Sequence, residues 1–208
     1  MEAQQEFSFR TWGGARDGAG RKRVGPRSNV PHRTREKFRK GTLHVTLRLR
    51  REVWSLRTHR CFRALKYAFA RGCQRFGYRL IHFSVQTNHV HLIVEAPDAV
   101  ALGRAMKGLE VRMARALNKV MRRKGPVFAD RYHAHLLRSP RETSCAVHHV
   151  LENWIVHARL DHQPLPRGVD PYCSDWPDDT GPPLVALPKF LMLCVGVARR
   201  RQQFARAA

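Results

Sequence analysis

Apolar and polar residues alternate strictly over residues 42–50, which is the period of a half-buried β-strand. Two further apolar runs, at residues 78–86 and 89–96, are joined by the turn-prone pair Thr87-Asn88 and predict a β-hairpin. Residues 127–138 predict one more strand. The apolar positions of the first strand are expected to face the core: Leu43, Val45, Leu47 and Leu49.

Three other segments repeat apolar residues at steps of three and four, which is typical of amphipathic helices. Thr58 is expected to cap the first helix, which stops at Gly77, and Asp98 the second, which ends near Gly125. The third begins at a capping box, Ser139-Pro140-Arg141-Glu142, and runs to about Leu160. The apolar positions of the first helix are Phe62, Leu65, Phe69, Cys73 and Phe76, and those of the second are Leu102, Met106, Leu109, Met113, Leu117 and Met121.

The order of these elements is β-α-β-β-α-β-α, which indicates an α+β fold. Its first six elements match the ferredoxin-like split βαβ arrangement, βαββαβ, a four-stranded antiparallel sheet with two helices on one face. The last helix then lies against the remaining face or an edge, where it can carry site residues. We expect this domain at residues 42–160, between a basic flexible arm at 1–41 and a Pro-rich linker with a basic extension at 161–208.

The net charge of the chain indicates a binding partner. The 208 residues contain 39 Lys and Arg against 16 Asp and Glu, a formal net charge of +23, and such a field most often serves nucleic acid. In the arm, Gly20-Arg21-Lys22 resembles an AT-hook peptide, although the usual core is Gly-Arg-Pro. The residues expected to contact DNA phosphates are Arg16, Arg21, Lys22 and Arg23 in the arm, and Arg104, Lys107, Arg112, Arg115, Arg122, Arg123 and Lys124 off the apolar stripe of the second helix.

Five cysteines without a C-x-x-C pair do not suit a zinc ribbon or a disulfide scaffold. The first residues lack a signal peptide pattern, and the longest apolar stretch is far shorter than the ~20 residues of a membrane helix. A reduced cytoplasmic location without membrane contact is therefore expected.

The chemistry of the chain centres on Asn88-His89-Val90-His91-Leu92, at the start of a predicted strand. Side chains alternate along a strand, so His89 and His91 point the same way about 7 Å apart. They can share one divalent cation if a third ligand arrives, or simply face solvent. His133 and His135 have the same spacing on another strand, so spacing alone does not identify a site. His44, His82 and His157 are expected to be ordinary surface or hydrogen-bonded residues.

The segment HFSVQTNHVHLIVEA resembles the central motif of the HUH single-tyrosine transposases, the small insertion-sequence and REP-associated enzymes. VFADRYHAHLL and the capped helix after it are similar to the same family, in the same order, and the resemblance spans roughly residues 42–160. It implies DNA transposition and recombination through metal-dependent cleavage and rejoining of single-stranded or hairpin DNA. By this resemblance His89, His91 and Asn153 bind Mg²⁺ or Mn²⁺, and the protein works as a homodimer.

The resemblance also implies a tyrosine nucleophile four residues before the helix ligand, and that position is His149. Three explanations stay open. His149 accepts the phosphoryl group itself and forms a labile phosphoramidate; Tyr132 on the adjacent strand replaces the missing tyrosine; or the chain is a catalytically inactive relative that acts as a DNA-binding protein. An RNA-binding protein of similar fold is disfavoured because no strand carries the aromatic-rich pattern of RNA-recognition modules.

Overall fold

The structure, a computed structural model, describes residues 37–160, 162–165, 167–176 and 181–190. Four basic residues of the predicted DNA-binding arm lie outside this range: Arg16, Arg21, Lys22 and Arg23. The described elements are β1 (Arg39–Arg48), α1 (His59–Ala70), β2 (Gln74–Arg75), β3 (Tyr78–Val85), β4 (His89–Asp98), α2 (Ala99–Val120), β5 (His133–Leu137) and α3 (Pro140–Leu160).

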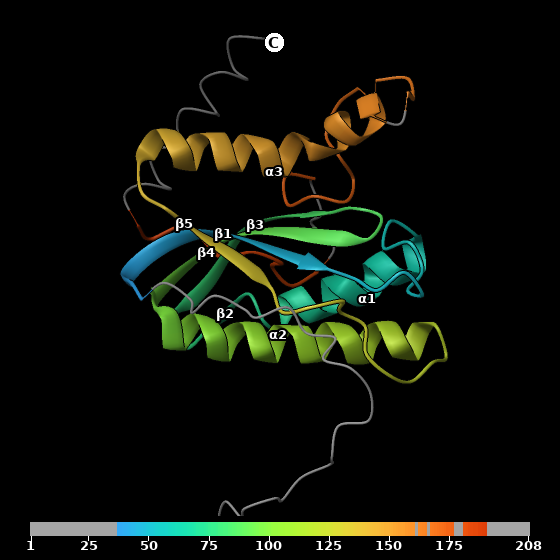
Figure 1. The fold of residues 1–208 in the computed structure, drawn as a ribbon, viewed down its shortest axis with the longest axis horizontal. Helices are drawn as coiled ribbons and strands as arrows, with labels where there is room; N and C mark the ends of the chain where they lie inside the picture. The colour runs from blue at the N-terminus through green and yellow to red at the C-terminus, as the bar shows by residue number, and fades with distance from the viewer. Residues whose placement is uncertain (1–36, 161, 166, 177–180, 191–208) are drawn as a thin grey trace, which may run out of the picture. The chain divides into compact units, whose positions relative to one another are not determined.

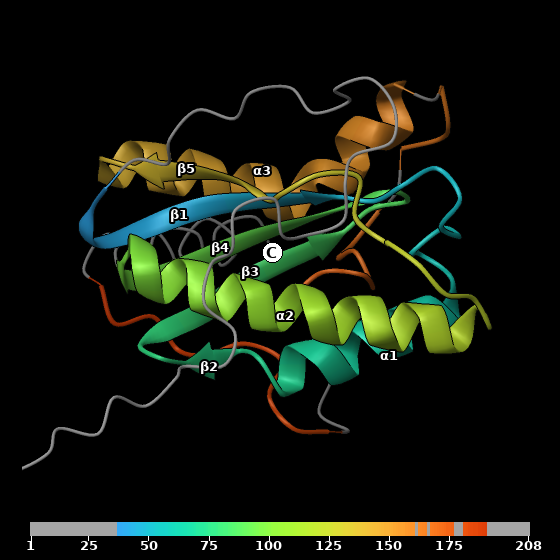
Figure 2. The same cartoon turned by 60° about the horizontal axis from the view of Figure 1, so that its bottom comes forward.

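The strands form one antiparallel sheet in the order β2-β3-β4-β1-β5. Without β2, this is the strand order of the ferredoxin-like split βαβ fold, so the predicted α+β class is confirmed. Figure 1 shows the sheet edge-on, with α1 and α2 covering one face and α3 covering the other. The turned view in Figure 2 shows the long strands side by side behind α2. The chain is thus layered as two helices, a sheet and a third helix, and α3 takes the face rather than the edge.

Each face of the sheet has its own apolar core. The predicted inward residues of β1 are at most 3% exposed and pack with the Leu and Met stripe of α2. On the opposite face, Ile81 and Ile93 pack with Leu137 and with Val147, Val150 and Leu151 of α3. Because both faces are covered, β3 and β4 are buried along most of their length and alternate little between apolar and polar residues.

The prediction of four strands was wrong by one, because α1 is shorter than its apolar pattern indicated. The helix ends at Ala70, so Cys73 and Phe76 are not part of it. Phe76 and Gly77 have φ angles of 54° and 77°, and they form the two-residue turn of a hairpin in which β2 pairs with β3. Two consecutive positive φ angles are what a tight hairpin turn requires.

Two further boundaries differ from the sequence prediction. The helix α2 ends at Val120 rather than near Gly125, and Arg122 just beyond it has a φ of 51° that ends the helical path. The last strand begins at His133 rather than at residue 127, and before it Phe128 forms only an isolated bridge with Leu49. The predicted starts of α1, α2 and α3 are confirmed.

The segment after α3 contacts the sheet along the outer edge of β3. Val85 donates its backbone N–H to Tyr172, and Ser174 donates to Phe83. Further along the same strand, Ala186 donates to Leu80. Together with β2, these described residues cover the edge of β3 along its length. None of the described helices is long and apolar enough to cross a membrane.

Candidate metal centre

The alternation of β4 places His89 and His91 on the face of the sheet that α3 covers. Val90 and Leu92, between and beyond them, belong to the core on the opposite face. The two imidazole rings are perpendicular, with centroids 4.7 Å apart. The predicted pair of histidines therefore lies on one side of the strand, close enough for both rings to contact a shared ligand.

The neighbouring strand contributes a third imidazole. In the antiparallel pairing of β1 with β4, Thr46 lies opposite His91, and His44 is two residues away on the same face. The Nε2 atom of His44 lies 2.9 Å from Nδ1 of His91, and the two rings stack with centroids 5.1 Å apart. The hydroxyl of Thr46 lies 3.3 Å from the same Nδ1 atom. His91 is thus held by β1 through its Nδ1 side.

The helix α3 brings three more side chains, at residues 149, 153 and 157, which share one helix face at steps of four. The ring of His149 lies 5.4 Å from His91 and 5.9 Å from His44, between centroids. The ring of His157 lies 5.3 Å from His89. The histidine cluster therefore comprises His44, His89, His91, His149 and His157.

Burial and mutual repulsion lower the pKa of four of these histidines, His44, His89, His91 and His149, and so favour their neutral form. Burial, followed by His89 and the other histidines around it, lowers the pKa of His91 to about 3. Burial is also the main cause that lowers the pKa of His44 and of His89 to about 4, and the pKa of His149 is lowered as well. Neutral imidazoles keep a nitrogen lone pair, which is the form that binds a metal ion.

The hydrogen bonds indicate which nitrogen is free to bind. His89 directs Nδ1 to the side-chain oxygen of Asn88 at 2.8 Å, so this nitrogen carries the hydrogen and donates it. His91 engages Nδ1 with His44 and Thr46. In both residues the Nε2 atom is left for a ligand, and Nδ1 bonds of this kind orient metal-binding histidines in general.

Asn153 is the residue predicted as a third ligand. It is 3% exposed, and its amide nitrogen is buried without a hydrogen-bond partner among the described residues. This –NH₂ group is a hydrogen-bond donor, so it can meet a phosphate oxygen, whereas a cation would bind the side-chain oxygen of the same amide. No group of three His, Cys, Asp or Glu side chains in the described part of the chain could hold a metal ion alone. A cation held by the two strand histidines therefore needs a ligand of another type, such as an amide or a phosphate oxygen.

The other candidate residues lie elsewhere. Tyr132 is 7% exposed and belongs to the core between the sheet, α1 and α2, whereas the histidine cluster lies on the opposite face. His133 and His135 are exposed on the face of the cluster, and His135 pairs with Glu142 of α3 at 2.6 Å. The structure thus brings His149 to the strand histidines and does not bring Tyr132 there.

Sequence reasoning missed His44 and His157. A usable signal was present for His157, because it lies four residues after Asn153 and eight after His149 on the same helix. For His44 the signal was weaker. The alternation of the first strand places it on the side away from the leucines, but only the strand register shows that it meets His91.

The predicted phosphate-contacting residues of α2 lie on the other side of the sheet. Most of them are exposed, and a hollow of about 530 Å³ at the end of this helix is lined by Arg115, Lys119, Arg122, Arg123 and Lys124. A smaller hollow is lined by Arg60 and Arg63 of α1. This basic surface, formed by the exposed Lys and Arg of α1 and α2, faces away from the histidine cluster.

Comparison with known proteins gives a consistent result. The family model of IS200-like transposases matches residues 37–145. A solved structure of a REP-associated tyrosine transposase bound to a REP hairpin is 17% identical, with a TM-score of 0.53, and the match covers 77% of this chain and 99% of that one. A putative transposase from Deinococcus radiodurans R1 is 15% identical, with a TM-score of 0.41, over 64% of this chain and 98% of that one. No curated protein matches the chain.

Proposed function

Because the chain belongs to the family of IS200-like transposases, we propose that it binds single-stranded or hairpin DNA and cleaves and rejoins one strand with a divalent cation. One observation carries this proposal. The neutral imidazole of His149 is partly accessible and lies beside the paired strand histidines, one helical turn before Asn153. The hairpin bound by the REP-associated transposase of similar fold supports hairpin DNA as the ligand.

His89, His91 and Asn153 would hold the cation, which is Mg²⁺ or Mn²⁺. Bound there, it would neutralise charge on the scissile phosphate and stabilise the leaving oxygen. The chain itself supplies orientation: Asn88 fixes the ring of His89, while His44 and Thr46 fix the ring of His91. Because the pKa values of His89 and His91 are lowered, both imidazoles are unprotonated at neutral pH. A cation therefore does not have to compete with protons for their ring nitrogens.

His149 takes the position of the nucleophile. Its unprotonated ring nitrogen attacks the phosphorus, a P–N bond forms, and the P–O3′ bond breaks. The 3′ oxygen leaves with the electron pair and takes up a proton, and the imidazole releases the proton of its other nitrogen. The products are a 5′-phosphohistidine link and a free 3′-hydroxyl, and the reverse attack by a 3′-hydroxyl rejoins a strand.

A second function, DNA binding without cleavage, is favoured by a different observation. No tyrosine of the described residues accompanies the histidine cluster, and Tyr132 would have to leave the core to reach a phosphate there. In this form the basic surface would bind DNA and the histidine cluster would serve at most to position a phosphate.

One experiment separates the two functions. The full chain is incubated with Mn²⁺ and a hairpin oligonucleotide carrying a single-stranded tail, and covalent protein–DNA adducts are sought on a denaturing gel under neutral conditions. An acid-labile adduct that mass spectrometry assigns to His149, and that His149→Ala abolishes, supports cleavage. Salt-sensitive binding with neither an adduct nor a nicked strand supports DNA binding alone, and an adduct on Tyr132 overturns the assignment of His149.

We also propose that the protein is a homodimer and that it works in a reducing cytoplasm. The four cysteines of the described residues are all free thiols, which suits such a compartment. Sedimentation of the full chain with and without hairpin DNA tests the dimer.

A further inference from the structure

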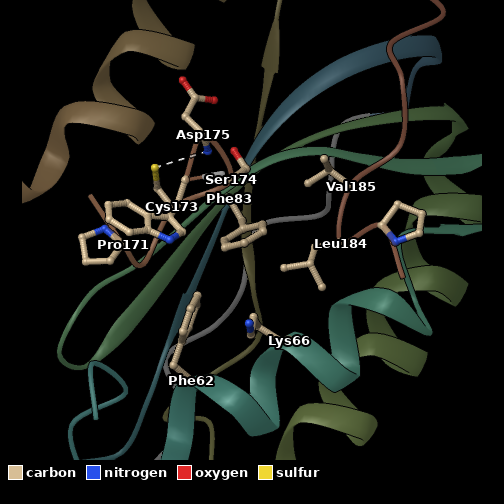
Figure 3. A pocket seen from close by; sticks show the side chains of 11 residues that line it. Phe62, Lys66, Phe83, Pro171, Cys173, Ser174, Asp175, Leu184 and Val185 are labelled. Carbon is tan, nitrogen blue, oxygen red and sulfur yellow. Dashed lines mark hydrogen bonds between the residues drawn. The ribbon is translucent and has the colours of Figure 1, made fainter. Parts of the chain in front are cut away.

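A pocket of about 340 Å³ lies between α1, β3 and the segment after α3, outside the histidine cluster. Figure 3 shows Phe62 and Lys66 projecting from α1, Phe83 from the sheet, and Leu184 and Val185 from the last described segment, around a common space. The pocket is therefore built jointly by the core domain and by residues 171–176 and 183–185, on the same side of the sheet as α1.

Aromatic rings form much of its wall. Phe62 meets Tyr172 edge to face with centroids 4.9 Å apart, and Phe83 lies 6.5 Å from Phe62. Trp176 also lines the pocket and is 45% exposed, so a large part of its indole is open to solvent. The guanidinium of Arg57 lies 4.4 Å from the centre of the Tyr172 ring and fixes that ring in place. Tyr172 does not itself line the pocket, but it packs against the lining residue Phe62 and so supports that ring from behind its edge-to-face contact.

A cation completes the lining. Lys66 projects from the same helix as Phe62, and its ammonium lies 5.9 Å from the centre of the Phe62 ring. Arg60 and Arg63, on the same helix, belong to the basic surface described above. A space lined by aromatic rings and an ammonium, with Ser174 and Asp175 also in its wall, lies at the border of the basic surface. It has the chemistry of a nucleotide site, because the rings can stack on a base while the cation contacts its phosphate.

We propose that this pocket holds one unpaired nucleobase of the DNA, stacked on Phe62 and Trp176, with Lys66 on the adjacent phosphate. This proposal rests on the proposed DNA-binding function. It adds that the pocket recognises a single-stranded part of the DNA, because a pocket of this kind takes a base only from an unpaired stretch. Stacking on aromatic rings tolerates every base, so the site senses whether the strand is single rather than its sequence.

The test compares two DNA probes and two matched variants. The probes are a fluorescein-labelled hairpin with a tail of unpaired thymidines and the same hairpin with a blunt end, and anisotropy gives the affinities. Trp176→Ala removes a pocket wall, and Trp54→Ala removes a tryptophan of similar exposure, 50%, that is not part of the pocket. We expect Trp176→Ala to weaken binding of the tailed hairpin about tenfold, as for the loss of one stacked base, and to leave the blunt hairpin unchanged.

A second measurement locates the base directly. With 5-iododeoxyuridine in the tail, irradiation is expected to crosslink the DNA to Trp176 or Phe62, as identified by mass spectrometry. The proposal is overturned if Trp176→Ala and Trp54→Ala bind the tailed hairpin with equal affinity, or if Trp176→Ala weakens binding of the tailed and the blunt hairpin equally. A crosslink that maps outside the pocket overturns it as well. Binding of neither probe by the unaltered chain overturns the DNA-binding function as well, whereas intact binding of the blunt hairpin leaves that function standing.

Discussion

His44 is the residue that sets the orientation of His91. Its Nε2 atom and the hydroxyl of Thr46 both lie at Nδ1 of His91, so the ring of His91 is held from the β1 side and turns its Nε2 atom to the ligand. Metal affinity depends on such partners nearly as much as on the ligands themselves. We therefore propose that His44 positions His91 and is not itself a ligand.

Replacing His44 by phenylalanine keeps a ring against His91 and removes the nitrogen. We expect His44→Phe to bind Mn²⁺ about tenfold more weakly than the unaltered chain, because Nδ1 of His91 loses the nearer of its two partners and keeps only the hydroxyl of Thr46. Titration with Mn²⁺, followed by electron paramagnetic resonance of the free ion, measures this. His135→Phe, an exposed histidine on the same face, is the control, and equal affinities in the two variants would contradict the role of His44.

The lowered pKa values also predict how stability depends on pH. The folded-state pKa values of His44, His89 and His91 are about 3 to 4, below the ordinary 6.5 of the unfolded chain. Between pH 6.5 and about 4, the unfolded chain therefore binds protons that the folded chain does not, so the free energy of unfolding falls as the pH falls through this window. Above it these histidines contribute nothing to the pH dependence.

Urea unfolding in metal-free buffer at several pH values across this window measures the slope. His91→Asn should make the slope shallower, since one of the groups with a lowered pKa is gone. An unchanged slope in this variant would show that other groups cause the pH dependence.

At the scale of the elements, one helix cap joins α2 to β4, the strand before it. Asp98 ends β4 and accepts the backbone N–H of Ala101 at 2.7 Å, so one residue closes the strand and starts α2. We expect Asp98→Ala to lower the free energy of unfolding by about 1 kcal/mol, the usual cost of losing such a cap. Asp98→Asn, which keeps an accepting oxygen, should cost much less in the same urea titration, and equal losses would contradict the capping role.

Elements whose pattern is local could be predicted from the sequence. The four long strands, the three helices and the caps at Thr58 and Asp98 each follow from residues that are close together in the chain. The two-residue strand β2 could not, because only its pairing with β3 defines it, and Cys73 and Phe76 continued the apolar period of the helix before it. Local patterns do not encode such pairings.

The same distinction applies to the candidate site. His89 and His91 are found through their spacing together with the family motif around them, and His149 and Asn153 through the resemblance to the same family. His44 lies 47 positions before His91, and nothing near it in the sequence distinguishes it from a surface histidine. Whether a polar residue of one strand meets a ligand of another depends on sheet order and register, which are properties of the folded chain.

At the scale of the whole molecule, a buried ion pair ties the segment after α3 to the domain. Arg57 donates to both carboxylate oxygens of Asp170 at 2.8 Å, and it also donates to the carbonyl of Val85. Asp170 is fully buried at its side chain, while Arg57 remains about a quarter exposed. Removing one member of such a pair leaves the other charge poorly compensated.

We expect Asp170→Ala to lower the free energy of unfolding by about 3 kcal/mol, near the low end for a broken buried pair because Arg57 keeps some contact with solvent. Urea titration at neutral pH measures the loss. The double variant Arg57→Met/Asp170→Leu should recover part of it, since no charge is then left buried. A loss below that of a surface pair, under about 1 kcal/mol, would show that the pair does not fasten the segment.

The coverage of β3 also limits how copies of this chain can associate. A sheet with two open edges can add strands on both sides and so grow into a filament. Here the edge of β3 beyond the two-residue strand β2 is already hydrogen-bonded to the chain's own residues 172–174 and 186, and within the described residues β5 and the short β2 are the strands that pair on one side only. Association of two chains through β5 would use this edge in both of them and leave only the two-residue strand β2 at each outer edge, so the pair would offer little for further growth through strands.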